Sequence, residues 1–126
     1  MRRIFLAMVL ALALAALPLS AHHGDTNYDL ATPFSISGTV VEFRFINPHL
    51  QITLDVTDSD GKVTRWAGQG TSPNMLVFRG WSRTSLKPGD KVTLNGNRSK
   101  NGSPAMKFGE VLMNGKPIGD WTPTGN

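Results

Sequence analysis

One eight-residue segment restricts the possible folds of this chain more than any other. From Leu50 to Thr57, apolar and polar residues alternate strictly. Because successive side chains of a strand point to opposite faces, this alternation places four apolar side chains together on one face. They are Leu50, Ile52, Leu54 and Val56. The segment therefore predicts a β-strand with one buried side and one solvated side, which is typical of antiparallel β-proteins.

The segment before it predicts a strand with one irregular position. Residues 34–46 are rich in β-branched and aromatic side chains, but their apolar residues fall in two different phases. The first phase contains Phe34, Ile36 and Val40, and the second contains Val41, Phe43 and Phe45. One extra residue explains this change, because a β-bulge shifts the alternation by one position. We therefore expect a bulge or sharp bend within residues 38–41, as in the long coiled first strand of a small barrel.

Turn and capping signals indicate a hairpin and then a helix. Asp58-Ser59-Asp60-Gly61 predicts a tight turn into a strand over residues 62–68. Further on, Ser72 suits an N-cap, Pro73 suits the first helical position, and Gly80 suits a left-handed exit. These signals predict one short helix of about two turns.

The remaining signals predict two more strands. Residues 86–90 have the composition of a tight turn that leads into a strand over residues 91–97. In that strand we expect Val92 and Leu94 to face inward. A polar loop then precedes a last strand over residues 105–113.

The predicted order is thus three strands, one short helix and two strands. Antiparallel chains of this size remove their exposed edges by closing into a barrel, and this element order is that of the OB-fold. A small sandwich is the alternative, but a sandwich of this length usually needs about seven strands. We expect an all-β domain with one short helix, a five-stranded OB-like antiparallel barrel over residues 34–118. A flexible C-terminal tail over residues 119–126 would follow it.

The N-terminus predicts export. Two arginines precede an apolar run of 14 residues, Ile4 to Leu17, and Pro18-Leu19-Ser20-Ala21 then supplies a helix break and small residues for cleavage. The run is shorter than the about 20 residues that a transmembrane helix needs. We therefore expect residues 1–21 to be a secretory signal peptide and the mature chain to begin near His22. The mature protein would be periplasmic or secreted, with no stable membrane insertion after cleavage.

Composition narrows the function classes. The 126 residues contain no cysteine, which excludes disulfides, thiolate metal centres, covalently attached c-type haem and a cysteine nucleophile. Removal of the 21 signal residues leaves 105, and the loss of two arginines lowers the basic count from 13 to 11 against 9 acidic residues. A net charge of +2 is a weak argument for nucleic acid, and we expect no such partner. The sequence also has no serine, histidine and acid set with diagnostic spacing and no phosphate-binding glycine loop, so we expect no catalytic residues.

Eight short motifs are spread along nearly the whole mature chain. They are His22-His23, Tyr28-Asp29, Gly38-Thr39-Val40, Asn47-Pro48-His49, Trp66, Ser72-Pro73, Arg79-Gly80-Trp81 and Leu86-Lys87-Pro88-Gly89-Asp90. Together these motifs resemble a family of short exported bacterial proteins that consists of a domain of unknown function. The resemblance implies an exported protein of a Gram-negative bacterium, with no assigned activity and no catalytic residues to carry over. Gly24 and Gln69 depart from the family pattern, in which serine and an acidic residue are common, and Gln69 has no carboxylate to act as a ligand or base.

The three histidines suggest a metal site, because they fall at only two places in the chain. His22 and His23 stand at the expected mature N-terminus, and His49 follows the first predicted strand. Imidazole nitrogens suit Cu(II), Zn(II) and Ni(II), and Cu(II) binds most tightly of the divalent series. Cleavage after Ala21 would let the amine and ring of His22 chelate one metal while His49 adds a third nitrogen, as in a histidine brace. Cleavage after Ser20 would instead make the new terminus a square-planar clamp for Cu(II) or Ni(II).

The brace has a structural requirement. The His-containing N-terminal segment over residues 22–33 must fold back to the first strand connection. Asp25 and Asp29 would then add oxygen ligands or hydrogen-bonding partners. In the alternative interpretation, the two N-terminal histidines belong to a flexible tail and the ring of His49 satisfies a backbone group in a turn. The sequence leaves both interpretations open.

Aromatic and basic residues also admit two interpretations each. Trp66 and Trp81 would stack a sugar or another flat ligand if exposed, but we expect them to plug the barrel and to close the end of the short helix. Five further side chains are expected to pack in the core or at the barrel end, namely Phe43, Phe45, Met75, Leu76 and Phe78. Four arginines either line an anion site near the start of the helix or are solvated, namely Arg44, Arg65, Arg79 and Arg83.

Three function classes remain. The leading hypothesis is an exported, non-enzymatic binding or accessory module whose partner is a periplasmic protein or small ligand of unknown identity. The second is a copper carrier or sensor that binds Cu(II) through His22 and His23, with or without His49, and redox catalysis would be an extension of that site. The third is nucleic-acid binding by analogy with other OB barrels; it rests on fold alone, and the export signal argues against it.

Overall fold

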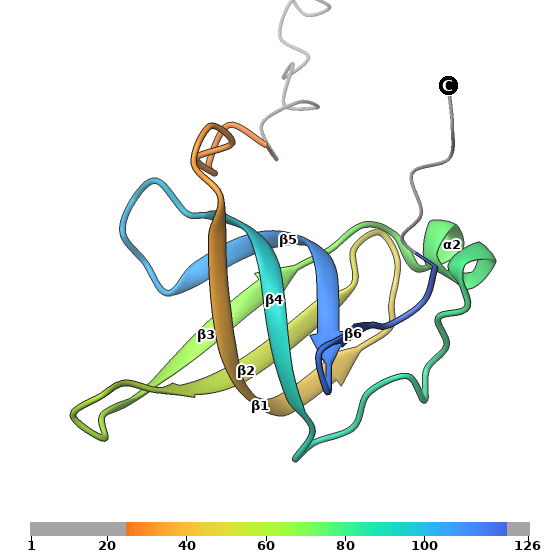
Figure 1. Cartoon of the computed structure of the whole chain (residues 1–126). Coiled ribbons are helices and arrows are strands. Elements are labelled where there is room, and N and C mark those ends of the chain that lie inside the picture. Colours follow the sequence, from red (N-terminus) through yellow and green to blue (C-terminus); the bar gives the residue numbers. More distant parts are fainter. Residues whose placement is uncertain (1–24, 121–126) are drawn as a thin grey trace, which may run out of the picture.

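The computed structural model describes residues 25–120, which form one strongly bent sheet and one helical segment (Figure 1). The strands are β1 (Phe34–Arg44), β2 (Gln51–Thr57), β3 (Val63–Gln69), β4 (Lys91–Arg98), β5 (Ala105–Met113) and β6 (Lys116–Pro117). Between β3 and β4, helix α2 (Pro73–Leu76) continues into the 3-10 helix η1 (Val77–Arg79). The predicted order of three strands, a short helix and two strands is confirmed, and β6 is an addition to it.

The strand pairing closes the sheet into a barrel. Its order is β3-β2-β1-β4-β5-β6, and β5 also pairs with β3 in parallel, with Ala67 opposite Ala105 and Gln69 opposite Lys107. A single sheet that closes on itself is a barrel and not a sandwich. Five closing strands with the helix between the third and the fourth have the topology of the OB-fold, so the predicted fold class is confirmed.

Strand β1 contains the predicted bulge. Val40 is opposite Leu54 and Glu42 is opposite Thr53, so Val41 is the extra residue. The β1 residues 34–39 pair with β4, whereas pairing with β2 begins at Thr39, just before the bulge, and continues to Arg44. Gly38 lies at this change of partner, where a Cβ atom would stand 2.6 Å from the carbonyl oxygen of Asp55. A bulge and a close backbone approach therefore let one strand serve both halves of the barrel.

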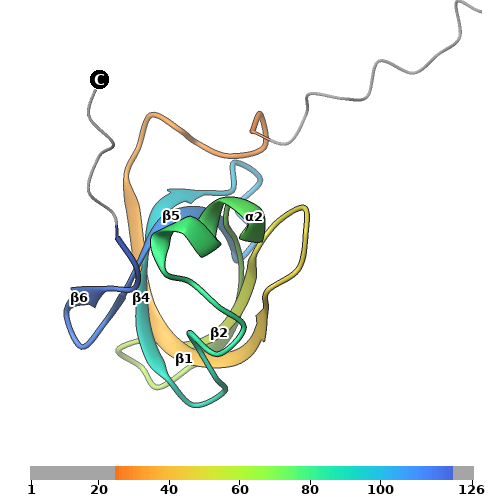
Figure 2. The same ribbon diagram turned by 90° about the vertical axis from the view of Figure 1, so that its right-hand side faces the viewer.

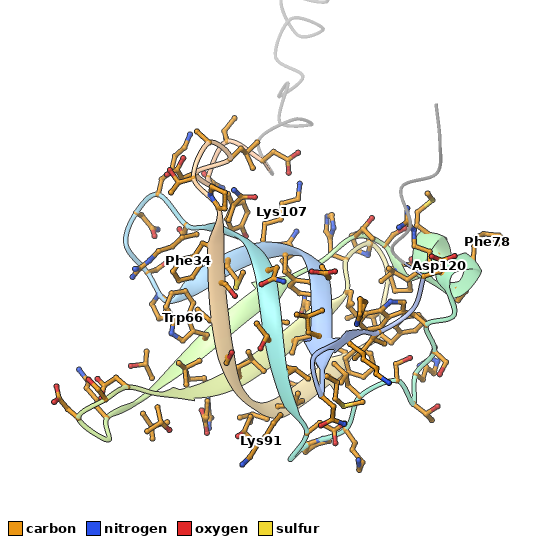
Figure 3. The ribbon with its side chains drawn as sticks, in the orientation of Figure 1. Phe34, Trp66, Phe78, Lys91, Lys107 and Asp120 are labelled. Atoms are coloured by element: carbon orange, nitrogen blue, oxygen red, sulfur yellow. The ribbon has the colours of Figure 1, made fainter. Side chains whose placement is uncertain are left out.

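The core follows the alternation of the strands. Leu50, Ile52 and Leu54 are fully buried. At one end of the barrel, Phe34 stacks on the buried Trp66 with ring centroids 5.4 Å apart (Figure 3). At the other end, buried Trp81 packs near Phe43 at 6.3 Å and lies beside the helical segment. Both tryptophans therefore pack in the core as expected, and the interpretation as exposed stacking platforms is wrong.

The helical segment lies across one end of the barrel (Figure 2). Pro73 is in its first turn and Gly80 ends it with a φ of 85°, as expected. Ser72 is the N-cap residue, as predicted, but its side chain makes no capping hydrogen bond. Met75 and Phe78 were expected to be buried, but they are 59% and 88% exposed. So short a segment turns only one narrow stripe, which includes Leu76, toward the core.

The chain beyond β5 makes further backbone contacts with the barrel and the helical segment. Strand β6 pairs with Leu112 and Met113. The N–H of Asp120 donates to the carbonyl oxygen of Arg79 at 2.9 Å, which holds this end of the chain against η1. The expected signal peptide over residues 1–21, His22 and His23, and the tail beyond 120 lie outside the described residues. Within residues 25–120, no helix has the length and apolar character that crossing a bilayer requires.

Candidate functional site

The segment before β1 lies above the start of that strand, beside the β4–β5 connection (Figure 1). Tyr28 forms a β-bridge with Ser99, and the N–H of Asp29 donates to the carbonyl oxygen of Arg98 at 2.9 Å. The side chain of Asn97 donates to the carbonyl oxygen of Asp29, also at 2.9 Å. Tyr28 and Asp29 are therefore attached to the end of β4 and to the residue that follows it.

An ion pair fastens the start of this segment to β5. Lys107 Nζ lies 2.5 Å from a carboxylate oxygen of Asp25. Beneath this pair is a pocket of about 400 Å³, which we call the His49 pocket. Its lining residues are Asp25, His49, Gln69, Gly70, Thr71, Lys107, Phe108 and Gly109. The structure thus brings Asp25 and His49, two of the residues singled out in the sequence, to one cavity.

The backbone around His49 is fixed by hydrogen bonds to the end of β3. The N–H of Leu50 donates to Thr71, and the N–H of Gly70 donates to Leu50, at 3.0 and 2.8 Å. Glycine at position 70 permits this approach, because a Cβ atom would stand 2.8 Å from the ring of Phe108, which would have to shift. The His49 loop and the β3 end are therefore held side by side.

The imidazole of His49 is oriented by the same loop. His49 Nδ1 lies 3.3 Å from the carbonyl oxygen of Gly70. A carbonyl oxygen only accepts, so this contact requires the proton on Nδ1 and leaves the lone pair on Nε2. In histidines that bind a metal through one ring nitrogen, the N–H of the other ring nitrogen commonly donates a hydrogen bond to a carbonyl oxygen in this way. The backbone contact foreseen by the alternative interpretation is thus present, and it is compatible with a ligand role for Nε2.

The described residues alone do not complete a metal site. Within residues 25–120, no group of three or more His, Asp or Glu side chains is placed to hold an ion. Asp29, which the sequence offered as a second oxygen donor, does not line the His49 pocket. The two N-terminal histidines lie outside the described part of the chain. Among the described residues, one imidazole and one carboxylate line the His49 pocket.

Two of the four arginines pair with acidic neighbours on the barrel wall. Arg65 binds the carboxylate of Asp55 through two hydrogen bonds of 2.9 and 3.1 Å. These bonds lower the pKa of Asp55 and raise that of Arg65. Arg44 lies 3.8 Å from Glu42. The charges of these two arginines are therefore balanced in part by acidic neighbours.

A second concave surface was not singled out in the sequence. The outer faces of β2 and β3 and the start of β5 meet the N-terminal segment in a groove of about 250 Å³, which we call the Tyr28 groove. Its lining residues are Tyr28, Gln51, Ile52, Thr53, Ala67, Gly68, Gln69 and Ala105. Gln69 belongs to both this groove and the His49 pocket. The alternation of the strands could have indicated which residues of β2 and β3 face outward. The position of Tyr28 could not be predicted in this way, because it depends on a contact between segments that are far apart in the sequence.

Comparison with solved structures gives distant similarities. Two crystal structures of the mitochondrial single-stranded DNA-binding protein Rim1 from S. cerevisiae match with TM-scores of 0.49 and 0.48 and identities of 13% and 11%. Each match covers 66% of this chain and 93% or 92% of the Rim1 chain. Similarity at this level supports no statement about a ligand, and the fold assignment rests on the strand pairing.

Comparison with sequences points to a family and not to an activity. No curated protein matches the chain. A family model described as a family of unknown function, DUF6152, matches residues 9–107 of the 126. This match spans the end of the N-terminal apolar run and the barrel as far as β5, in agreement with the extent of the motifs. The chain therefore belongs to the family of unknown function DUF6152.

Proposed function

We propose that this protein is an exported, non-enzymatic binding module and that the His49 pocket is its ligand site. One observation carries the proposal: the N-terminal segment folds back so that Asp25 and His49 line the same cavity. The oriented imidazole, the carboxylate and the nearby ammonium of Lys107 are polar groups that converge in an otherwise largely apolar hollow. Ligand sites of small proteins commonly combine an apolar lining with a few such groups. The signal-like N-terminus supports action in the periplasm or outside the cell.

A copper ion is the second, finer candidate, and the same fold-back favours it. His22 and His23 precede Asp25 by three and two positions. A chain spans at most about 3.3–3.6 Å per residue, so both histidines are within about 11 Å of the position of Asp25. The brace needs the N-terminal segment to approach His49, and the path of residues 25–33 is compatible with this requirement. His49 Nε2, the N-terminal amine and the ring of His22 would then supply nitrogen donors of the kind Cu(II) prefers.

The experiment uses protein processed by its native export pathway, since the cleavage site decides which N-terminus is present. Intact mass and N-terminal sequencing identify the cut, and Cu(II) titration with paramagnetic resonance follows on the same sample. We expect one-to-one, submicromolar binding and nitrogen hyperfine structure. His49→Ala should weaken a brace at least about tenfold. Cu(II) binding that is unchanged in this variant would assign the metal to the N-terminal clamp alone.

Asp25→Asn and Asp29→Asn form a matched pair. Both aspartates belong to the N-terminal segment, but only Asp25 lines the His49 pocket. We expect Asp25→Asn to change the Cu(II) affinity or spectrum and Asp29→Asn to leave both unchanged. Weak binding that neither His49→Ala nor N-terminal blocking alters would overturn the copper assignment. The broader proposal would then be tested by amide shift mapping with periplasmic extract fractions, and shifts that avoid the His49 pocket would overturn it.

A further inference from the structure

We propose that the Tyr28 groove is a second binding site and that its ligand is a neutral saccharide. The groove is separate from the His49 pocket, although Gln69 lies between the two. This inference does not depend on metal binding or on the residues outside the described range. It rests on the position, the charge and the hydrogen-bonding capacity of the groups that line the groove.

The groove is concave because small residues form its floor. Ala67 and Ala105 are opposite each other where β3 pairs with β5, and Thr53 is opposite Ala67 on β2. Larger side chains, Gln51 and Gln69, flank this floor in the next row, where they are also opposite each other. Tyr28 forms the remaining wall, and its β-bridge to Ser99 fixes its backbone. A volume of about 250 Å³ is suitable for one pyranose ring of a longer chain.

The lining offers hydrogen-bonding groups that other protein groups do not use. The phenol of Tyr28, the hydroxyl of Thr53 and the amide of Gln69 have no side-chain hydrogen-bond partner among the described residues. The Oε1 atom of Gln51 accepts from Arg44 at 3.3 Å, which leaves its NH₂ group able to donate to a ligand. Amides and hydroxyls both donate and accept, as sugar hydroxyls do. An aromatic ring beside them offers an apolar surface for the C–H face of a sugar.

The charge of the lining distinguishes this ligand class from nucleic acid. Every side chain that lines the groove is uncharged. Single-stranded nucleic acid requires cationic side chains along its backbone and stacking platforms for its bases. The lining itself contains one aromatic ring and no lysine or arginine. A neutral, hydroxyl-rich ligand satisfies these groups without leaving a phosphate unpaired.

The test is amide shift mapping of the ¹⁵N-labelled mature protein with maltotetraose and with chitotetraose. We expect saturable shifts at millimolar or lower concentrations, centred on the outer faces of β2 and β3, and no dependence on salt. Chitotetraose binding alone would indicate that the ligand carries acetamido groups, and binding of both probes would indicate recognition of hydroxyls. Absence of saturable shifts with both probes would overturn the proposal. Salt-dependent shifts of the same residues with oligothymidylate, and none with the sugars, would also overturn it in favour of nucleic acid.

Matched variants locate the site. Tyr28→Ala and Gln69→Ala should each weaken saccharide binding about tenfold, and Tyr28→Phe should retain the part due to the ring. Thr53→Val should weaken binding, whereas Thr57→Val, on the same outer face of β2 but outside the groove, should not. Folding is checked by the exchange protection of the Asp29 amide, which bonds to Arg98. Equal affinity of Thr53→Val, Tyr28→Ala and the unaltered protein would contradict the assignment.

Discussion

Lys107 and Asp25 form an ion pair of 2.5 Å that joins β5 to the segment before β1. The two side chains are 38% and 65% exposed, so the pair lies in a largely aqueous environment. Exposed ion pairs contribute little to global stability, typically about 0–1 kcal/mol. The same contribution is a larger share of the small free energy that holds a local segment on the barrel.

Replacement of Lys107 by methionine should therefore loosen the N-terminal segment without unfolding the barrel. We expect the unfolding free energy to fall by at most about 1 kcal/mol and the Asp29 amide to exchange faster with solvent. Hydrogen exchange followed by NMR measures both. Lys116→Met, an exposed lysine on β6, is the control and should leave the Asp29 amide protected. Equal protection in both variants would show that backbone bonds alone hold the segment.

Glycine is required at position 96 but not at position 109. A Cβ atom on Gly96 would stand 2.0 Å from the carbonyl oxygen of Lys107, where the β4–β5 register shifts. A Cβ atom on Gly109 would meet nothing within 4 Å. Gly96→Ala should destabilise the protein by about 2–3 kcal/mol or more, because the backbones of two paired strands must separate. Gly109→Ala should change stability by less than about 0.5 kcal/mol in urea denaturation; similar losses in both would refute the packing argument.

Truncation of two nearby residues of the helical segment should lower the stability of the protein by very different amounts. Leu76 is 1% exposed and Phe78 is 88% exposed. Leu76→Ala should cost about 2–5 kcal/mol, because it removes buried methyl groups and leaves a cavity at the barrel end. Phe78→Ala should change stability by no more than about 0.5 kcal/mol, although it removes the larger side chain. Thermal unfolding of both variants tests this, and a large loss for Phe78→Ala would mean that this side chain is covered in solution.

The Asp55–Arg65 pair should make the unfolding free energy depend on pH in the acid range. The hydrogen bonds from Arg65 lower the pKa of Asp55 below its ordinary value of 3.8. The pair therefore stabilises the fold at pH values above 3.8, and this contribution is lost as the pH falls through the lowered pKa. Asp55→Asn should reduce the difference between urea midpoints at neutral and acid pH, and added salt should reduce it in the unaltered protein.

Asp60→Asn is the control for this acid dependence. Asp60 lies in the neighbouring turn, and its carboxylate has no ion pair among the described residues. The variant should keep the pH dependence of the unaltered protein. If Asp55→Asn and Asp60→Asn reduced it equally, general charge and not the pair would be its cause.

Local rules predicted much of the barrel from sequence. The alternation over residues 50–57 identified the buried face of β2, because the side-chain period of a strand does not depend on its partner. The change of phase in β1 identified the bulge at Val41 for the same reason. Pro73 and Gly80 marked the helical segment, since their backbone preferences act within a few residues. The predicted last strand over residues 105–113 coincides with β5.

Prediction was wrong where burial depended on the surroundings of an element. Residues 75–78 are four consecutive apolar residues. Their sequence therefore does not show which side chains of the helical segment face the core and which face solvent. The pairing of β6 and the attachment of Asp120 to Arg79 were likewise not foreseen. Both contacts depend on which other segment of the folded chain lies beside the residues after β5.

The sequence by itself determined the chemistry available to this protein: no thiols, three histidines at two places, a signal-like start and an alternating barrel pattern. Only the tertiary structure decided which of these groups meet. Closure of β3 onto β5 places Gln69 opposite Lys107, and Lys107 holds Asp25 beside the pocket of His49. The same closure sets Tyr28 against β2 and β3. Such meetings arise from contacts between residues far apart in the chain, whereas periodicity and capping report only on near neighbours.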